Sequence, residues 1–255
     1  MSILDFEKTE NPCKKFIERK NGNWQYYDKE TKTNITIPEL RFIVVDELSC
    51  ITGFNDNLRS GIYSNEVHDL SKQELNVKSF KPGIHFKGLY ADIKDSVTAK
   101  SVGGQFTKSV YCLLAETTGM TLACIKMSGA VLGGWIEKGF KTYGNIITID
   151  GYKEGKKGSV IFQIPIFISA GKVEGDVLAK AKEQATPLIE FLKQYENSKS
   201  AETKSDFLDA HSDEIPQENN YTEGVDYEAI AKEEISEDFS VNAILTEDEN
   251  KNLPF

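Results

Sequence analysis

The sequence predicts a mainly β domain, followed by a helix and an acidic tail. Between about residues 22 and 172, short apolar runs alternate with Gly-, Asn- and Lys-rich turns, a pattern typical of strands joined by hairpins. Residues 175–197 instead carry apolar side chains at helical spacing. Beyond residue 197 the composition is too polar to offset the entropy cost of ordering, which predicts disorder.

The expected strands are short and closely spaced. NWQYYD (23–28), LRFIVVDELSCITGF (40–54) and GIYSNEVHD (61–69) come first. The middle of the chain supplies NVKSF, IHFKGLYADI, QFTKSVYCLLAE and MTLACIKM, separated by Gly-containing turns. The last pair, NIITIDGY and GSVIFQIPIFIS, flanks the lysine-rich turn KEGKKG. This succession predicts a small sheet of roughly five strands.

One helix is expected among the strands and one after them. Segment 129–141 has apolar residues at helical spacing, with Ser128 as its candidate N-cap. In the later helix, Pro187 is expected to introduce a kink or a break. A small sheet with one helix inserted between strands predicts an OB-fold-like, partly open β-barrel. An immunoglobulin-like sandwich is the alternative, although it has no place for the inserted helix.

The charge is unevenly distributed along the chain. The formal net charge is −10, yet residues 201–255 alone hold 16 Asp or Glu and three basic residues. Residues 1–200 therefore hold 27 Lys or Arg and 24 Asp or Glu, a mildly basic balance. Such asymmetry predicts polyanion binding by the body or an interaction through the acidic tail.

A cytoplasmic protein without membrane contact is expected. The first residues lack a basic region followed by an apolar run, and no window approaches the roughly 18 apolar residues of a membrane span. The four cysteines form no CxxC pair, which predicts reduced thiols.

Motifs of enzyme chemistry are not evident. None of the three histidines, His68, His85 and His211, has the spacing of a zinc site. GYKEGKKGS (151–159) fails the spacing of a phosphate-binding P-loop and leads into an expected strand rather than a helix. The scattered carboxylates Asp92, Asp95 and Glu116 are interpreted as solvated. We therefore expect no catalytic residue, metal or cofactor.

Aromatic residues interleaved with lysines are the chemistry that the body offers. On a strand, alternate side chains share a face, so Phe106 and Lys108 are expected together, as are Phe86, Tyr90 and Lys94. Such rings can stack on bases, at roughly 1–3 kcal/mol per base, while lysines contact phosphates; the alternative is that the rings fill the core. The predicted DNA-binding residues are Phe86, Lys87, Tyr90, Lys94, Lys100, Phe106, Lys108, Tyr111, Lys153, Lys156 and Lys157.

The end of the sequence resembles the acidic tip of bacterial single-stranded DNA-binding proteins. Asp248 and Glu249 precede Leu253-Pro254-Phe255, although Asn250, Lys251 and Asn252 separate carboxylates and apolar residues that the family keeps adjacent. IYSNEVHD (62–69), GLYADI, SVYCLL and IKMSGAVLGGWIEKGFK (125–141) resemble single-stranded DNA-binding proteins of tailed bacteriophages, over most of residues 40–170. The resemblance implies a docking tip for replication and recombination proteins formed by Asp248, Glu249, Leu253, Pro254 and Phe255.

The sequence thus predicts a non-catalytic protein that coats single-stranded DNA in replication, recombination and repair. A replisome adaptor that binds no DNA is one alternative, and a metal-dependent DNA-processing enzyme is a less favoured one. The sequence does not fix the oligomeric state. The predicted parts are an OB-like DNA-binding domain (1–172), a C-terminal helix (173–197), a disordered acidic linker (198–245) and a partner-docking tip (246–255).

Overall fold

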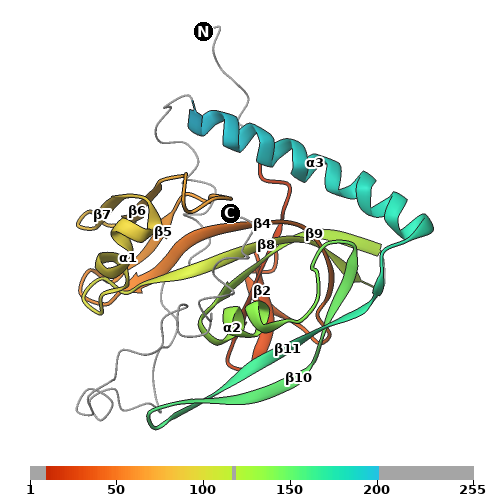
Figure 1. The fold of residues 1–255 in the computed structure, drawn as a ribbon, viewed down its shortest axis with the longest axis horizontal. Helices are drawn as coiled ribbons and strands as arrows, with labels where there is room; N and C mark the ends of the chain where they lie inside the picture. The colour runs from red at the N-terminus through yellow and green to blue at the C-terminus, as the bar shows by residue number, and fades with distance from the viewer. Residues whose placement is uncertain (1–9, 117–118, 201–255) are drawn as a thin grey trace, which may run out of the picture.

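The computed structural model describes residues 10–116 and 119–200, with side chains described up to residue 195. Within this part the chain is mainly β, as predicted, and eleven strands belong to one sheet (Figure 1). The strands are β1 (Lys15–Lys20), β2 (Asn23–Asp28), β3 (Thr33–Ile37), β4 (Arg41–Asn55), β5 (Ser60–Ser64), β6 (Leu75–Ser79), β7 (His85–Gly88), β8 (Gly104–Glu116), β9 (Gly119–Ser128), β10 (Asn145–Lys157) and β11 (Val160–Lys172).

The long strand β4 organises the sheet. The strand order is β3-β2-β1-β9-β8-β4-β5-β6-β7, and the hairpin β10–β11 branches from the start of β4. All pairings are antiparallel except that of β1 with β9, which is parallel. Strand β4 pairs with β10 near its start, with β8 along its length and with β5 at its end, and its pairing with β8 has a bulge between Val44 and Asp46.

The sheet is larger than the roughly five strands expected. Strands β1 to β3 precede β4, and residues 56–103, here called the insertion, add β5, β6, β7 and helix α1 (Tyr90–Thr98) between β4 and β8. IHFKGLYADI was predicted as one strand, but β7 ends at Gly88 and α1 follows. Ile93 and Val97, four residues apart, are buried on one side of α1, so helical periodicity overrides the strand interpretation. Phe86, Tyr90 and Lys94 therefore do not share a strand face, and that prediction is wrong.

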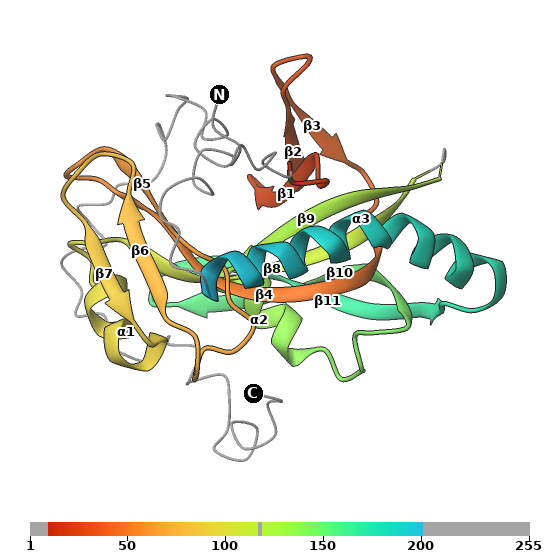
Figure 2. The same cartoon turned by 90° about the horizontal axis from the view of Figure 1, so that it is seen from above.

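Two further helices cover opposite faces of the sheet. Helix α2 (Gly129–Glu137) confirms the predicted inserted helix, although Ser128 makes no side-chain capping hydrogen bond. Helix α3 (Gly175–Ser200) confirms the second one; it is continuous through Pro187, so the expected break does not occur. Figure 2 shows α3 lying across β9, β8 and β4. No helix of the described residues is long and apolar enough to cross a membrane.

Alternating side chains of the central strands feed two separate cores. We call the face that packs on α2 the inner face; Phe42 of β4, Val110 of β8 and Ile125 of β9 point there, against Trp135 of α2. The outer face carries Leu48, Tyr111 and Cys124, against Leu188, Phe191 and Leu192 of α3. Both sets of alternating side chains of the central strands are thus buried, one set on each face.

Side-chain hydrogen bonds, rather than backbone pairing, connect β1 and β2 to the branching hairpin β10–β11. The indole Nε1 of Trp24 on β2 donates to the Tyr152 hydroxyl of β10 at 3.0 Å. Arg19 of β1 donates through Nη2 to Oε1 of Gln163 on β11 at 2.7 Å. A Cβ on Gly134 would lie 2.2 Å from the Pro165 carbonyl oxygen, so glycine permits the close approach of α2 to β11. The sheet stays open, since β11 pairs only with β10 among the described strands.

Candidate nucleic-acid interface

The inner face of β8 brings two of the predicted aromatic residues into contact. The rings of Phe106 and Tyr90 lie 5.2 Å apart between centroids at a tilt of 43°. Phe106 is half-buried and packs against both the inner-face core under α2 and the core of the insertion, so it lies at their junction. Tyr90 opens α1, which explains how two segments predicted as separate strands converge.

Lys108 lies beside Phe106 on β8, and Lys138 lies near Lys108. Lys108 points to the inner face as Phe106 and Val110 do. Lys138 follows α2; its Nζ lies 4.0 Å from the Trp135 ring centroid and donates to the Trp135 carbonyl oxygen at 3.0 Å. Burial lowers the pKa of Lys138, nearby Glu47 opposes that effect, and Lys108 adds to it. Two lysines near one carboxylate leave a local excess of positive charge, suited to a phosphate.

The other predicted residues of the insertion are dispersed. Phe86 faces the insertion core. Lys87, its neighbour on β7, points to the opposite face and pairs with Glu74 at 3.3 Å. Lys94 is half-buried on α1, and Lys100 is exposed beyond the end of that helix. The strand interpretation missed this separation because it placed Phe86, Lys87 and Lys94 on one continuous strand, with Lys100 beyond it.

Lys153, Lys156 and Lys157 lie on strand β10 rather than in a turn. Their strand neighbours on β11 are Ile164, Ile161 and Val160, and the chain reverses at Gly158, whose φ is 57°. Lys153 forms an ion pair with Glu137 at the end of α2. Ile161 is 64% exposed and Val160 is 43% exposed. The distal hairpin, which projects from the body in Figure 1, thus combines lysines with exposed β-branched side chains.

The base of this hairpin contains residues that the sequence interpretation missed. The Arg19 guanidinium lies 4.4 Å from the ring centroid of Tyr152, which is 39% exposed. This cation–π pair places a further cation and an aromatic ring near the three hairpin lysines. No local motif signals it, because the two residues are brought together only by the curling of the sheet.

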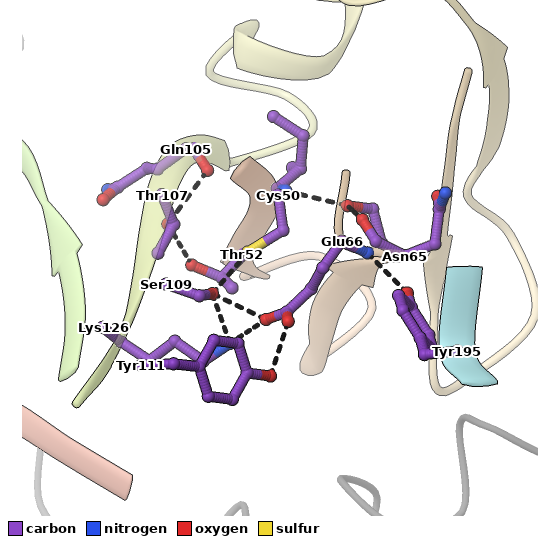
Figure 3. A network of polar contacts seen from close by, with 12 residues as sticks. Cys50, Thr52, Asn65, Glu66, Gln105, Thr107, Ser109, Tyr111, Lys126 and Tyr195 are labelled. Carbon is purple, nitrogen blue, oxygen red and sulfur yellow. Dashed lines mark hydrogen bonds and ion pairs between the residues drawn. The ribbon is translucent and has the colours of Figure 1, made fainter. Parts of the chain in front are cut away.

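Tyr111 does not belong to a DNA-binding surface. It is 1% exposed on the outer face, and its hydroxyl donates to Oε2 of Glu66 at 2.6 Å (Figure 3). Such a ring cannot stack on a base without unpacking α3, so the prediction is wrong. The sequence pattern could not show this, because Phe106 and Tyr111 differ only in which face of one strand they occupy.

The partners of Tyr111 form a closed polar network. Ser109 and Lys126 donate to Oε1 of Glu66 at 2.6 and 2.5 Å, and the Glu66 backbone N–H donates to the Tyr195 hydroxyl of α3 at 2.8 Å. Burial alone would raise the pKa of Glu66, but Lys126 and the two hydroxyl groups outweigh it and lower that pKa to about 2. The network therefore ties β8, β9, the insertion and α3 together around an ionised pair.

The described carboxylate Glu116 and the four thiols lie in internal contacts or in the core. Among the described residues, no three His, Cys, Asp or Glu side chains gather where they could hold a metal ion. Glu116 pairs with Lys15 at 2.5 Å and accepts from Thr121. The thiols of Cys13, Cys50, Cys112 and Cys124 are buried and free of disulfides. Burial raises the pKa of Cys13 to about 12, and it also raises those of Cys112 and Cys124, which disfavours reactive thiolates.

The predicted docking tip, Asp248, Glu249, Leu253, Pro254 and Phe255, and nearly all of the predicted linker lie outside the described residues. Comparisons of the chain with protein-family models, curated proteins and solved structures found no match.

Proposed function

We propose that this protein binds single-stranded DNA without sequence preference and has no catalytic role. The observation that carries the proposal is the order of the central elements. In chain order, β4, β8, β9, α2, β10 and β11 give five strands with one helix after the third. This is the succession expected of an OB-type barrel, a fold that commonly binds oligonucleotides.

The pairing supports the same fold assignment. The third, second and first of these strands are neighbours in the sheet, and the first also pairs with the fourth, which pairs with the fifth. Strand β1 lies parallel to β9, and the contacts of Arg19 and Trp24 bridge the remaining gap to β10 and β11. The result corresponds to a partly open barrel with strands added at its seam.

The fold assignment suggests where DNA binds. In OB folds, ligands contact the second and third strands and the loops between strands one and two and between strands four and five. Here these correspond to β8, β9, the insertion and the tip of the β10–β11 hairpin. Phe106, Tyr90 and Lys108 lie on or beside β8, and Lys156 and Lys157 lie on the hairpin. Rings for bases and cations for phosphates are thus present along this path.

The acidic segment fits the proposal as a second functional part. With 16 Asp or Glu, residues 201–255 compete with DNA for basic surface at low salt, and residues 246–255 dock replication proteins. Removal of residues 201–255 is therefore expected to keep or strengthen DNA binding while abolishing partner recruitment. Both statements rest on the sequence, because this segment lies outside the described residues.

Fluorescence anisotropy with labelled oligo(dT) and a matching duplex tests the proposal. We expect the whole chain to prefer the single strand, with an affinity that falls steeply as salt rises. A variant ending at residue 200 should bind at least as tightly. Equal binding of both nucleic acids, or no binding to either, would contradict the proposal.

The alternative of a replisome adaptor that binds no DNA draws on one observation. Val160 and Ile161 on the hairpin are exposed apolar residues of a kind that often marks protein contacts. Absence of oligonucleotide binding by both chain lengths would favour this alternative.

A further inference from the structure

The outer face of β8, β4 and the three strands of the insertion carries an uninterrupted row of side chains. The strand register aligns Gln105 of β8, Thr52 of β4, Tyr63 of β5, Lys78 of β6 and His85 of β7. Four inter-strand spacings of about 4.8 Å make the row about 19 Å long. The opposite side chains, such as Ile62 and Val77, fill the core of the insertion, so the row faces away from it.

One aromatic ring, that of Tyr63, belongs to this row, and the rings of Phe80 and Phe54 lie next to it on the same face. The ring centroids of Tyr63 and Phe80 lie 4.5 Å apart. Phe54 points to the same face, because it pairs with Gly61, two residues before Tyr63. Phe54 is 45% exposed and Phe80 is 36% exposed.

The segment that presents Phe80 is held by hydrogen bonds. The hydroxyl of Ser79 donates to the Lys81 carbonyl oxygen at 2.6 Å and accepts from the Ile84 N–H at 3.2 Å. The Phe80 N–H donates to the Gly61 carbonyl oxygen at 3.2 Å. Gly83 has a φ of 142°, a conformation that other residues rarely adopt. A backbone held in this way loses little conformational entropy when the ring that it carries binds a ligand.

Basic residues lie in this row and in the turns next to it, and Lys87 of the same face is paired with Glu74. Lys78 lies within the row, while the exposed residues Lys81 and Arg59 lie in the turns beside Phe80 and before β5. Helix α3 covers other parts of the outer face; the contact of its Tyr195 with Glu66 lies near the last of its described side chains. The rings therefore lie on a surface that the described part of α3 does not bury.

We propose that this outer aromatic row, defined as Phe54, Tyr63, Phe80 and Lys78, is a second contact surface for single-stranded nucleic acid. The inference rests on the proposed function and extends it to residues outside the predicted site. Solvent-exposed rings stack on bases of any sequence, and Lys78 supplies the charge that complements a phosphate. Because Phe106 and Lys108 lie on the inner face, only a long oligonucleotide reaches both surfaces.

Affinity measurements at two oligonucleotide lengths test this surface in the full chain. The variants are Phe54→Leu, Phe80→Leu and their combination; leucine keeps apolar contact but removes the ring. Tyr143→Leu is the matched control, since Tyr143 is 59% exposed outside the row. We expect the double variant to bind oligo(dT) of about 30 nucleotides about tenfold more weakly, with little change for about 8 nucleotides. Melting curves establish that each variant is folded.

Ultraviolet cross-linking to bromouracil-substituted oligonucleotide supplies a second measurement. We expect cross-linked peptides that contain Phe54, Tyr63 or Phe80. If the double variant keeps wild-type affinity and these peptides show no cross-link, the proposal that the row contacts nucleic acid is wrong. The proposed function is then unaffected. Failure of the wild-type chain to bind oligo(dT) overturns both. If the substitutions change the affinity only while residues 201–255 are present, the row binds that acidic segment and not DNA.

Discussion

The two faces of strand β8 give similar residue types opposite tasks. On the outer face, Tyr111 is bonded to Glu66, and Lys126 of the adjacent strand pairs with the same carboxylate. On the inner face, Phe106 packs at the edge of two cores and against the Tyr90 ring, and no ion pair engages Lys108 within the described residues. Full burial with internal partners therefore keeps Tyr111 from contact with a ligand, whereas the half-buried Phe106 keeps part of its ring accessible.

The largest expected effect is a loss of stability when the Glu66 network on the outer face is disrupted. Glu66→Gln removes the charge that neutralises Lys126, whose side chain is only 25% exposed, and weakens the bonds from Ser109 and Tyr111. We expect a loss of about 3 kcal/mol in the free energy of unfolding, measured by urea denaturation. The double variant Glu66→Gln/Lys126→Met should recover part of that loss. A loss below about 1 kcal/mol in the single variant would show that the network contributes little.

The pH dependence of stability checks the same carboxylate. The folded state lowers the pKa of Glu66 from its ordinary 4.5 to about 2. The stability that ionised Glu66 contributes is therefore fully present above about pH 4.5 and is lost as the pH falls toward 2. Urea denaturation of the wild-type chain should show this decline. The decline of the unfolding free energy with falling pH should be shallower in Glu66→Gln. Equal slopes in the two proteins would contradict the assignment of Glu66 as an ionised carboxylate in the folded state.

A pair of conservative substitutions on β8 separates the two faces functionally. Phe106→Leu removes an inner-face ring, and we expect oligo(dT) affinity to fall about tenfold, within the range of one stacked base. Tyr111→Phe removes the bond to Glu66 and should cost about 1–2 kcal/mol of stability, with unchanged DNA affinity. Anisotropy and urea denaturation of both variants give the comparison. A reversed pattern would place the DNA on the outer side of β8.

Local periodicity accounts for what the sequence predicted well. Local periodicity alone predicts which side chains are buried in the long alternating runs of β4, β8 and β9 and in the helical segment 129–137. The insertion was harder, because YADIKDSVT is short and follows a strand without a strong helix cap.

The candidate site was predictable only in part. Phe106 and Lys108 follow from alternation, but their face does not, since alternation cannot say which side α3 covers. The pairing of Arg19 with Tyr152 depends on contacts between distant segments and leaves no local signal. The outer aromatic row likewise depends on the register of five strands, which no single segment determines.

The smallest expected effect concerns the hairpin, where the question is whether exposed lysines act as phosphate contacts or only as solvated charges. Lys156→Gln/Lys157→Gln leaves the core untouched, so stability should change by less than about 0.5 kcal/mol. If each lysine neutralises one phosphate, the slope of log affinity against log salt should flatten by about 1.4 for a single strand. Lys180→Gln/Lys182→Gln on the exposed side of α3 removes the same charge elsewhere and should leave the slope nearly unchanged. Equal flattening in both variants would mean that net charge, and not the hairpin, attracts the DNA.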